Sequence, residues 1–204
     1  MSGFSVVLDA NVIYNGPVRD TILRALDEEL FRGYWTAEII KEAVRSLVAD
    51  GRMTEERAQH LEEELGLAFP ESWIGGYQAY VPLVRNHVKD RHILAAAIHA
   101  HAQVIVTFNI RHFPAHALAD FGIEAQHPDV FLVYLYYLDP EAMVRIVRRQ
   151  AADCKRPPQT VARLLDVLSQ HVPRFAQLIQ QDIVDEEQRG GVPEAGQGSG
   201  RVGE

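Results

Sequence analysis

The chain has 204 residues, of which 47% are hydrophobic, and it carries a net charge of −8 at neutral pH. This length fits one domain of ordinary size with a small appendage, and no apolar run reaches the ~18 residues needed to cross a bilayer. The single cysteine, Cys154, excludes an internal disulfide, and no Cys/His group has the spacing of a zinc site. No basic region precedes the first apolar run, so we expect no signal peptide, no membrane association and a cytoplasmic location.

The first half of the chain predicts strands that alternate with helices. The apolar run Val6–Leu8 is typical of a buried parallel strand, and it ends at Asp9. Apolar residues at helical spacing predict a helix over Pro17–Leu30, with Gly33 as its C-terminal stop. The elements expected next are a short strand at Tyr34–Trp35, a helix capped by Thr36 that runs to about Val48, and a helix over Met53–Leu65 capped by Thr54.

After a stretch rich in helix breakers at 69–84, the same alternation returns. The expected elements are a helix at Arg91–Ala102, a strand at Val104–Thr107, a short strand at Gly122–Ala125 and a helix at Pro128–Leu138. The pattern predicts an α/β fold, a three-layer α/β/α sandwich with a central parallel sheet. Functional residues of such sheets lie at the carboxyl ends of the strands where strand order reverses, which singles out Asp9 and Thr107–Asn109.

From Asp139 the composition changes to two helical segments, around Pro140–Ala152 and Thr160–Ile183. The first carries a basic cluster that either binds RNA or a partner, or forms a solvated face with local salt bridges; its residues are Arg145, Arg148, Arg149, Lys155 and Arg156. We expect a domain at residues 4–137, a C-terminal helical module at 138–184, and a disordered tail at 185–204.

Three carboxylates are candidates for chemistry, and each also has an ordinary structural interpretation. Asp9 follows the first strand, where its carboxylate either belongs to the functional site or stabilises a turn or a helix start. Glu42 lies on the helix begun by Thr36, on the same face as Glu38, where solvated glutamates are common. Asp90 opens the alanine-rich helix, where an aspartate usually caps.

Competing α/β enzymes lack their signatures in this chain. There is no GxGxxG, no GxxxxGK[ST] and no GxSxG motif, which argues against dinucleotide-binding, P-loop and α/β-hydrolase folds. A phosphotransfer or phosphatase site built on Asp9 remains open, although no lysine directly follows Thr107 or Ala125.

Three strings in the expected order resemble the PIN-domain family: VVLDANVIY, EIIKEAVRSL and VKDRHILAAAIHAHAQVIVTFNIRHFP. The resemblance covers roughly residues 4 to 135. It implies a dimeric ribonuclease that depends on Mg²⁺ or Mn²⁺, and many bacterial members resemble VapC-type toxins held inactive by an antitoxin protein. On this basis Asp9, Glu42 and Asp90 are the expected metal ligands and catalytic residues together with Asn109, while Asn11 and Thr107 would orient ligands and water.

One departure from the family pattern concerns a further aspartate often found after the fourth strand. The corresponding places carry Asn109 and His112, and Asp129 is a substitute only by its nearness in sequence. This departure motivates the alternative function, a PIN fold with weakened catalysis that acts as an RNA- or protein-binding module. The acidic net charge is unusual for a nucleic-acid-binding protein, but it suits a basic partner, and metal-binding carboxylates account for part of it.

Overall fold

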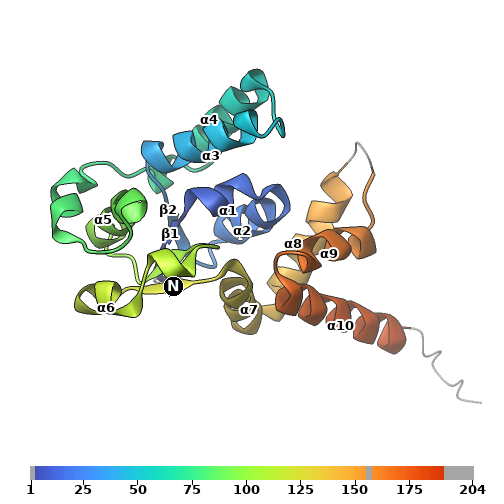
Figure 1. The fold of residues 1–204 in the computed structure, drawn as a ribbon. Coiled ribbons are helices and arrows are strands. Elements are labelled where there is room, and N and C mark those ends of the chain that lie inside the picture. The colour runs from blue at the N-terminus through green and yellow to red at the C-terminus, as the bar shows by residue number, and fades with distance from the viewer. Residues whose placement is uncertain (1–2, 155–157, 191–204) are drawn as a thin grey trace, which may run out of the picture.

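The computed structural model describes residues 3–154 and 158–190, and its centre is a parallel sheet (Figure 1). The strand order is β2-β1-β3-β4, and every neighbouring pair is parallel. The strands are β1 (Ser5–Leu8), β2 (Arg32–Tyr34), β3 (Val104–Val106) and β4 (Glu124–Gln126). The central strands β1 and β3 are apolar and buried, as expected for strands covered on both faces.

The helices surround this sheet, and Figure 1 shows α5 on one side of β1 and β2 with α1 and α2 on the other. The α-helices are α1 (Ala10–Tyr14), α2 (Gly16–Asp27), α3 (Ala37–Ala49), α4 (Glu55–Ala68), α5 (Arg91–His99), α6 (Ala115–Leu118), α7 (Pro128–Leu138), α8 (Pro140–Asp153), α9 (Val161–Ser169) and α10 (Pro173–Gly190). The predicted α/β class with a central parallel sheet is confirmed, and within the described residues no helix is long and apolar enough to cross a bilayer.

Strand order reverses between β1 and β3, because the chain leaves β1 for β2 on one side and later returns to β3 on the other. Val7 pairs with Tyr34 in β2 and with Ile105 in β3. Asp9 and Thr107 each follow one of the two central strands directly. The topology therefore brings these residues to the same crevice at the carboxyl edge of the sheet, where ligands of such folds bind.

The predicted helix caps at Thr36, Thr54 and Thr160 are present, but the expected stop at Gly33 is wrong. Helix α2 ends at Asp27, and Glu29 adopts a left-handed conformation with φ of 56°. Gly33 instead lies inside β2, where a Cβ atom would come within 3.0 Å of Leu26 Cδ2. A side chain here would crowd Leu26 and Phe31, so the glycine allows the strand to pack closely against α2, a tertiary contact that local spacing does not express.

The C-terminal helices also differ from the prediction. The single helix expected over 160–183 is interrupted, and Pro173 begins α10 as a separate helix. Proline favours a helix start because it lacks the N–H donor and has a fixed φ. Helix α10 continues to Gly190, past the expected tail boundary at 185, and Glu186 pairs with Arg148 at 2.6 Å. Residues 191–204 lie outside the described part of the chain.

The basic cluster on α8 is largely neutralised by carboxylates. Glu28 accepts from Arg145 at 3.3 Å and from Arg149 at 2.8 Å, and Arg148 meets Glu186. Lys155 and Arg156 lie outside the described residues. These pairs favour the solvated face with local salt bridges over an RNA-binding surface, and exposed pairs of this kind contribute little stability.

Asp129 holds the C-terminal helices on the domain, so we expect its replacement to destabilise the protein. Its buried Oδ1 accepts a hydrogen bond from the backbone N–H of Phe175, in the first turn of α10, at 3.0 Å. Asp129→Ala should lower the free energy of unfolding by about 1–3 kcal/mol, because that buried N–H loses its acceptor. Asp129→Asn keeps an acceptor oxygen and is the matched control in thermal unfolding. Equal stability of Asp129→Ala and the wild type would contradict this role.

Candidate active site

Asp9 is buried at the crevice and does not cap a helix with its side chain. It stands at the N-cap position of α1, yet its carboxylate accepts no capping hydrogen bond. Its Oδ2 accepts from Thr107 Oγ1 at 2.5 Å and from Asn11 Nδ2 at 2.6 Å. The helix-cap interpretation therefore does not account for this aspartate, whose carboxylate is held by Thr107 and Asn11.

Thr107 and Asn11 join the ends of the two central strands. Besides donating to Asp9, the Thr107 hydroxyl accepts from Asn11 Nδ2 at 3.1 Å and from the Asn109 N–H at 2.9 Å. Asn11 Oδ1 accepts from the Phe108 N–H at 3.0 Å. The network fixes the orientation of the Asp9 carboxylate and the turn after β3. Asn109 enters this network through its backbone.

The environment of Asp9 raises the pKa of its carboxyl from 3.8 to about 6. Burial is the largest cause, and hydrogen bonds from Thr107 and Asn11 oppose it. The negative charges of Asp90 and Glu42 raise the pKa further, so both carboxylates lie close enough to repel Asp9. The ionised form of Asp9 is consequently costly in the protein without a cation.

Asp90 begins α5 and is buried, but its side chain makes no capping hydrogen bond. Its Oδ2 lies 3.1 Å from His87 Nδ1 and 2.7 Å from His112 Nδ1. The Asn86 side chain donates to the Asp90 carbonyl at 3.0 Å, which anchors the turn that carries the carboxylate. The ordinary capping interpretation of Asp90 is therefore not supported by its contacts.

Glu42 lies on α3 at the edge of a surface hollow of about 620 Å³. Its Oε2 is 3.7 Å from the buried Nε2 of His92, a nitrogen without a hydrogen-bond partner among the described residues. Glu38, which shares this face, accepts from the Tyr77 hydroxyl.

Three cationic side chains line the same hollow: Lys41, Arg45 and Lys89. The sequence analysis did not identify these three cations. The only sequence signal was the helical spacing of Lys41 and Arg45 from Glu38 and Glu42.

The three carboxylates face one crevice but do not converge on a single point. Their charges interact, yet their oxygens do not all lie within 4.8 Å of one another. Oxygen donors of this kind fit Mg²⁺ or Mn²⁺, and Mg²⁺ keeps several waters, which can span carboxylates that are spread apart. Repulsion on the buried Asp9 is relieved by a cation, so the donor set is chemically suited to one. Asp129 does not belong to this set, because it is engaged with Phe175.

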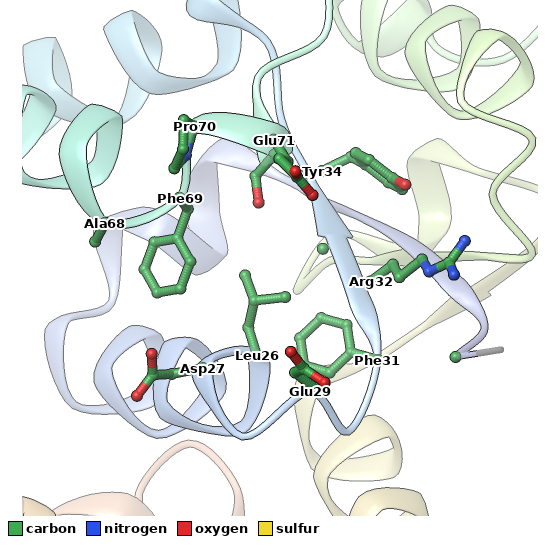
Figure 2. Close-up of a pocket in the computed structure, with 13 residues that line it drawn as sticks. Leu26, Asp27, Glu29, Phe31, Arg32, Tyr34, Ala68, Phe69, Pro70 and Glu71 are labelled. Carbon is green, nitrogen blue, oxygen red and sulfur yellow. The ribbon is translucent and has the colours of Figure 1, made fainter. Parts of the chain in front are cut away.

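A second hollow, of about 710 Å³, lies at the edge strand β2, away from these residues. Figure 2 shows Leu26, Phe31 and Phe69 around it, with the carboxylates of Asp27 and Glu71 on its rim. None of the candidate site residues lines it, and we assign it no function.

The comparisons with known proteins divide the chain into two matched regions. A model described as "PIN domain" matches residues 5–111, and one described as "VapC50 C-terminal domain" matches residues 128–181. The chain is 44% identical over 101 residues to a Mycobacterium tuberculosis protein named "Putative ribonuclease VapC50". That match covers 50% of this chain and 60% of the relative's own length. No solved structure matches the chain.

Proposed function

Because the chain belongs to the PIN-domain family, we propose that it is a metal-dependent endoribonuclease that hydrolyses RNA phosphodiester bonds. The observation that carries the proposal is a group of three carboxylates: Asp9 directly after β1, Glu42 on α3 and Asp90 directly before α5. Burial, together with the charges of Asp90 and Glu42, raises the pKa of Asp9 to about 6. The name of the 44% identical relative supports RNA as the substrate class.

The proposed metal ligands are Asp9, Glu42 and Asp90, with Mg²⁺ or Mn²⁺ as the cation. A bound divalent cation lowers the pKa of a coordinated water and offsets negative charge that develops on the phosphate. Thr107 and Asn11 hold the Asp9 carboxylate at a fixed angle, since both donate to its Oδ2. Asn109 belongs to this network through its backbone N–H, and we propose that its side chain orients water or a phosphate oxygen.

The proposed path of the RNA runs over the hollow beside Glu42. Three positive charges line this hollow next to the proposed site, those of Lys41, Arg45 and Lys89, although the whole chain has a net charge of −8. Cations in this position can contact the RNA backbone, because phosphate contacts supply most sequence-independent affinity. The hollow thus carries three cations beside the carboxylates of Glu38 and Glu42, although the chain as a whole is acidic.

We further propose that the protein is the toxin of a toxin–antitoxin pair, acts in the cytoplasm and forms a homodimer. The family resemblance and the name of the relative support the first part. We retain the proposed division into a nuclease domain at 4–137 and a helical module at 138–184, with residues 185–190 added to the module because α10 continues there. An acidic surface suits a basic antitoxin segment.

One experiment with three reactions separates the proposed nuclease from the binding module and the phosphatase. Purified protein is incubated with a structured RNA in Mg²⁺, with the same RNA in EDTA, and with a generic phosphomonoester. We expect RNA cleavage in Mg²⁺ alone. RNA binding without cleavage would favour the binding module, and hydrolysis of the phosphomonoester without RNA cleavage would favour a phosphatase.

Thr107→Val should reduce cleavage by about 10–100-fold, the range observed when groups that orient metal ligands are removed. Valine has the shape of threonine but cannot donate to Asp9 Oδ2 or accept from the Asn109 N–H. Thr107→Ser keeps the hydroxyl and should retain most of the rate. Initial rates at saturating Mg²⁺ test this, and equal rates for Thr107→Val and the wild type would exclude the positioning role.

A further inference from the structure

A compact cluster of two imidazoles and a carboxylate lies beside the proposed Mg²⁺ ligands. His87, Asp90 and His112 each offer one ligand atom, and these atoms all lie within 4.8 Å of one another. We propose that they form a separate binding site for a transition-metal ion of the Zn²⁺ class. The proposal concerns ion binding by the isolated protein and does not require the protein to cleave RNA.

The local backbone presents these three side chains to one point. His87 precedes the 3₁₀ helix Val88–Asp90, in which side chains three positions apart lie on the same side. His112 ends the 3₁₀ helix Ile110–His112, in the turn that follows β3. The His87 N–H donates to the His112 carbonyl at 3.2 Å, and the Asp90 N–H donates to the His87 carbonyl at 2.9 Å. Backbone hydrogen bonds thus hold the two turns together.

The distances between the donor atoms are close to those around a tetrahedral ion. Both Nδ1 atoms face Asp90 Oδ2, at 3.1 Å for His87 and 2.7 Å for His112. Ligands bound to Zn²⁺ at about 2.0–2.1 Å are separated from one another by roughly 3.3–3.4 Å. On this estimate, the separation from Asp90 Oδ2 would have to grow by about 0.2–0.3 Å at His87 and by about 0.6–0.7 Å at His112 to admit the ion.

One nitrogen of the cluster has no hydrogen bond of its own. His112 Nδ1 is buried and, within the described residues, lacks a hydrogen-bond partner, because Asp90 Oδ2 is near it but off the direction of the ring N–H. A buried nitrogen without a partner is costly in a folded protein. Coordination through its lone pair would satisfy it.

The two rings must open slightly to share an ion. They are stacked with their centroids 4.2 Å apart and their planes 13° from parallel, whereas each lone pair lies in its own ring plane. The His87 side chain is 44% exposed, so its ring can turn toward solvent by giving up its stacking on His112. Three protein ligands then leave a fourth position for water.

The chemistry of the donors distinguishes this site from the one at Asp9. Imidazole nitrogens favour Zn²⁺ and related transition metals, whereas carboxylates and waters favour Mg²⁺. Asp90 would be common to both sites and would use its Oδ2 for the transition metal. We therefore expect Zn²⁺ to weaken Mg²⁺ binding, since two cations on one carboxylate repel each other.

The test is calorimetric titration of the metal-free full-length protein with Zn²⁺, without RNA. We expect one ion per chain in the wild type and a loss of at least tenfold in affinity in His87→Ala and in His112→Ala. His116→Ala removes an exposed histidine outside the cluster, and Asp9→Asn changes the neighbouring site; both should bind Zn²⁺ as the wild type does. Thermal unfolding of each variant establishes that it is folded.

Each other outcome contradicts the proposal. Undiminished Zn²⁺ binding in the His87→Ala/His112→Ala double variant would place the ion elsewhere. Absence of binding to the wild type would show that the three side chains do not form a metal site. Loss of Zn²⁺ in Asp9→Asn alone would assign the ion to the carboxylate site. Failure of the nuclease proposal would appear as absent RNA cleavage, which this titration does not measure.

Discussion

Asp9→Asn should abolish RNA cleavage while making the metal-free protein more stable. The substitution removes a charged metal ligand, and loss of several kcal/mol of transition-state stabilisation corresponds to a decrease of roughly 10³-fold or more. An asparagine oxygen can still accept from Thr107 and Asn11, so the fold should persist. Single-turnover cleavage in Mg²⁺ measures the first effect. The control is Asp120→Asn, at an exposed position of the 3₁₀ helix Ala119–Phe121.

The stability effect has a definite pH dependence. The pKa of Asp9 rises from 3.8 to about 6 on folding, so the folded protein holds this proton more tightly than the unfolded chain. The contribution of Asp9 to the free energy of unfolding is therefore most favourable below the lower pKa. It is lost as pH rises through 6, with a cost on the order of 2–3 kcal/mol at neutral pH. In EDTA, Asp9→Asn should exceed the wild type in melting temperature at pH 7.5. The difference should shrink as pH falls toward 4.

Two results would contradict this interpretation of Asp9. Full cleavage activity of Asp9→Asn would remove Asp9 from the site. A stability difference independent of pH would show that the charge of Asp9 is not the cause.

Mg²⁺ or Mn²⁺ should raise the melting temperature of the wild type, because the carboxylates are assembled in the folded state alone. At a concentration about 100 times the dissociation constant, the gain is about 2.7 kcal/mol. For a chain of this size each kcal/mol corresponds to roughly 2–4 °C. The double variant Asp9→Ala/Asp90→Ala should show no rise at the same concentration. An equal rise in that variant would locate the stabilising metal outside the proposed site.

The main features of the fold could be predicted because they follow from local patterns. Buried runs such as Val6–Leu8 and capping residues such as Thr36 determine single elements, and parallel pairing then brings Asp9 and Thr107 to one edge. The helix stop predicted at Gly33 was wrong and the helix start at Pro173 was not predicted, for different reasons. Gly33 lies in a strand that packs against Leu26 of the preceding helix, a contact that helical spacing does not express. Pro173 is a local signal masked by the helical periodicity around it.

From the fold pattern alone, the candidate site could be predicted only at residues that follow strands, whereas Glu42 and Asp90 were expected from the family resemblance. Asp9 and Thr107 are placed by the sheet, but the position of Glu42 depends on how α3 packs. The histidine cluster could not be found from spacing, since zinc motifs place ligands close together in sequence and His112 is separated from Asp90 by α5 and β3. The cations near Glu42 come from two elements and are likewise a product of tertiary structure.

The most direct measurement is a Mg²⁺ titration in which RNA cleavage and thermal stabilisation are recorded on the same wild-type preparation after EDTA treatment and dialysis. If the carboxylates of Asp9, Glu42 and Asp90 bind the cation that drives cleavage, both quantities should rise from their metal-free values with the same midpoint. Cleavage at full rate in EDTA, or cleavage that saturates in Mg²⁺ without any rise in melting temperature, would contradict the account.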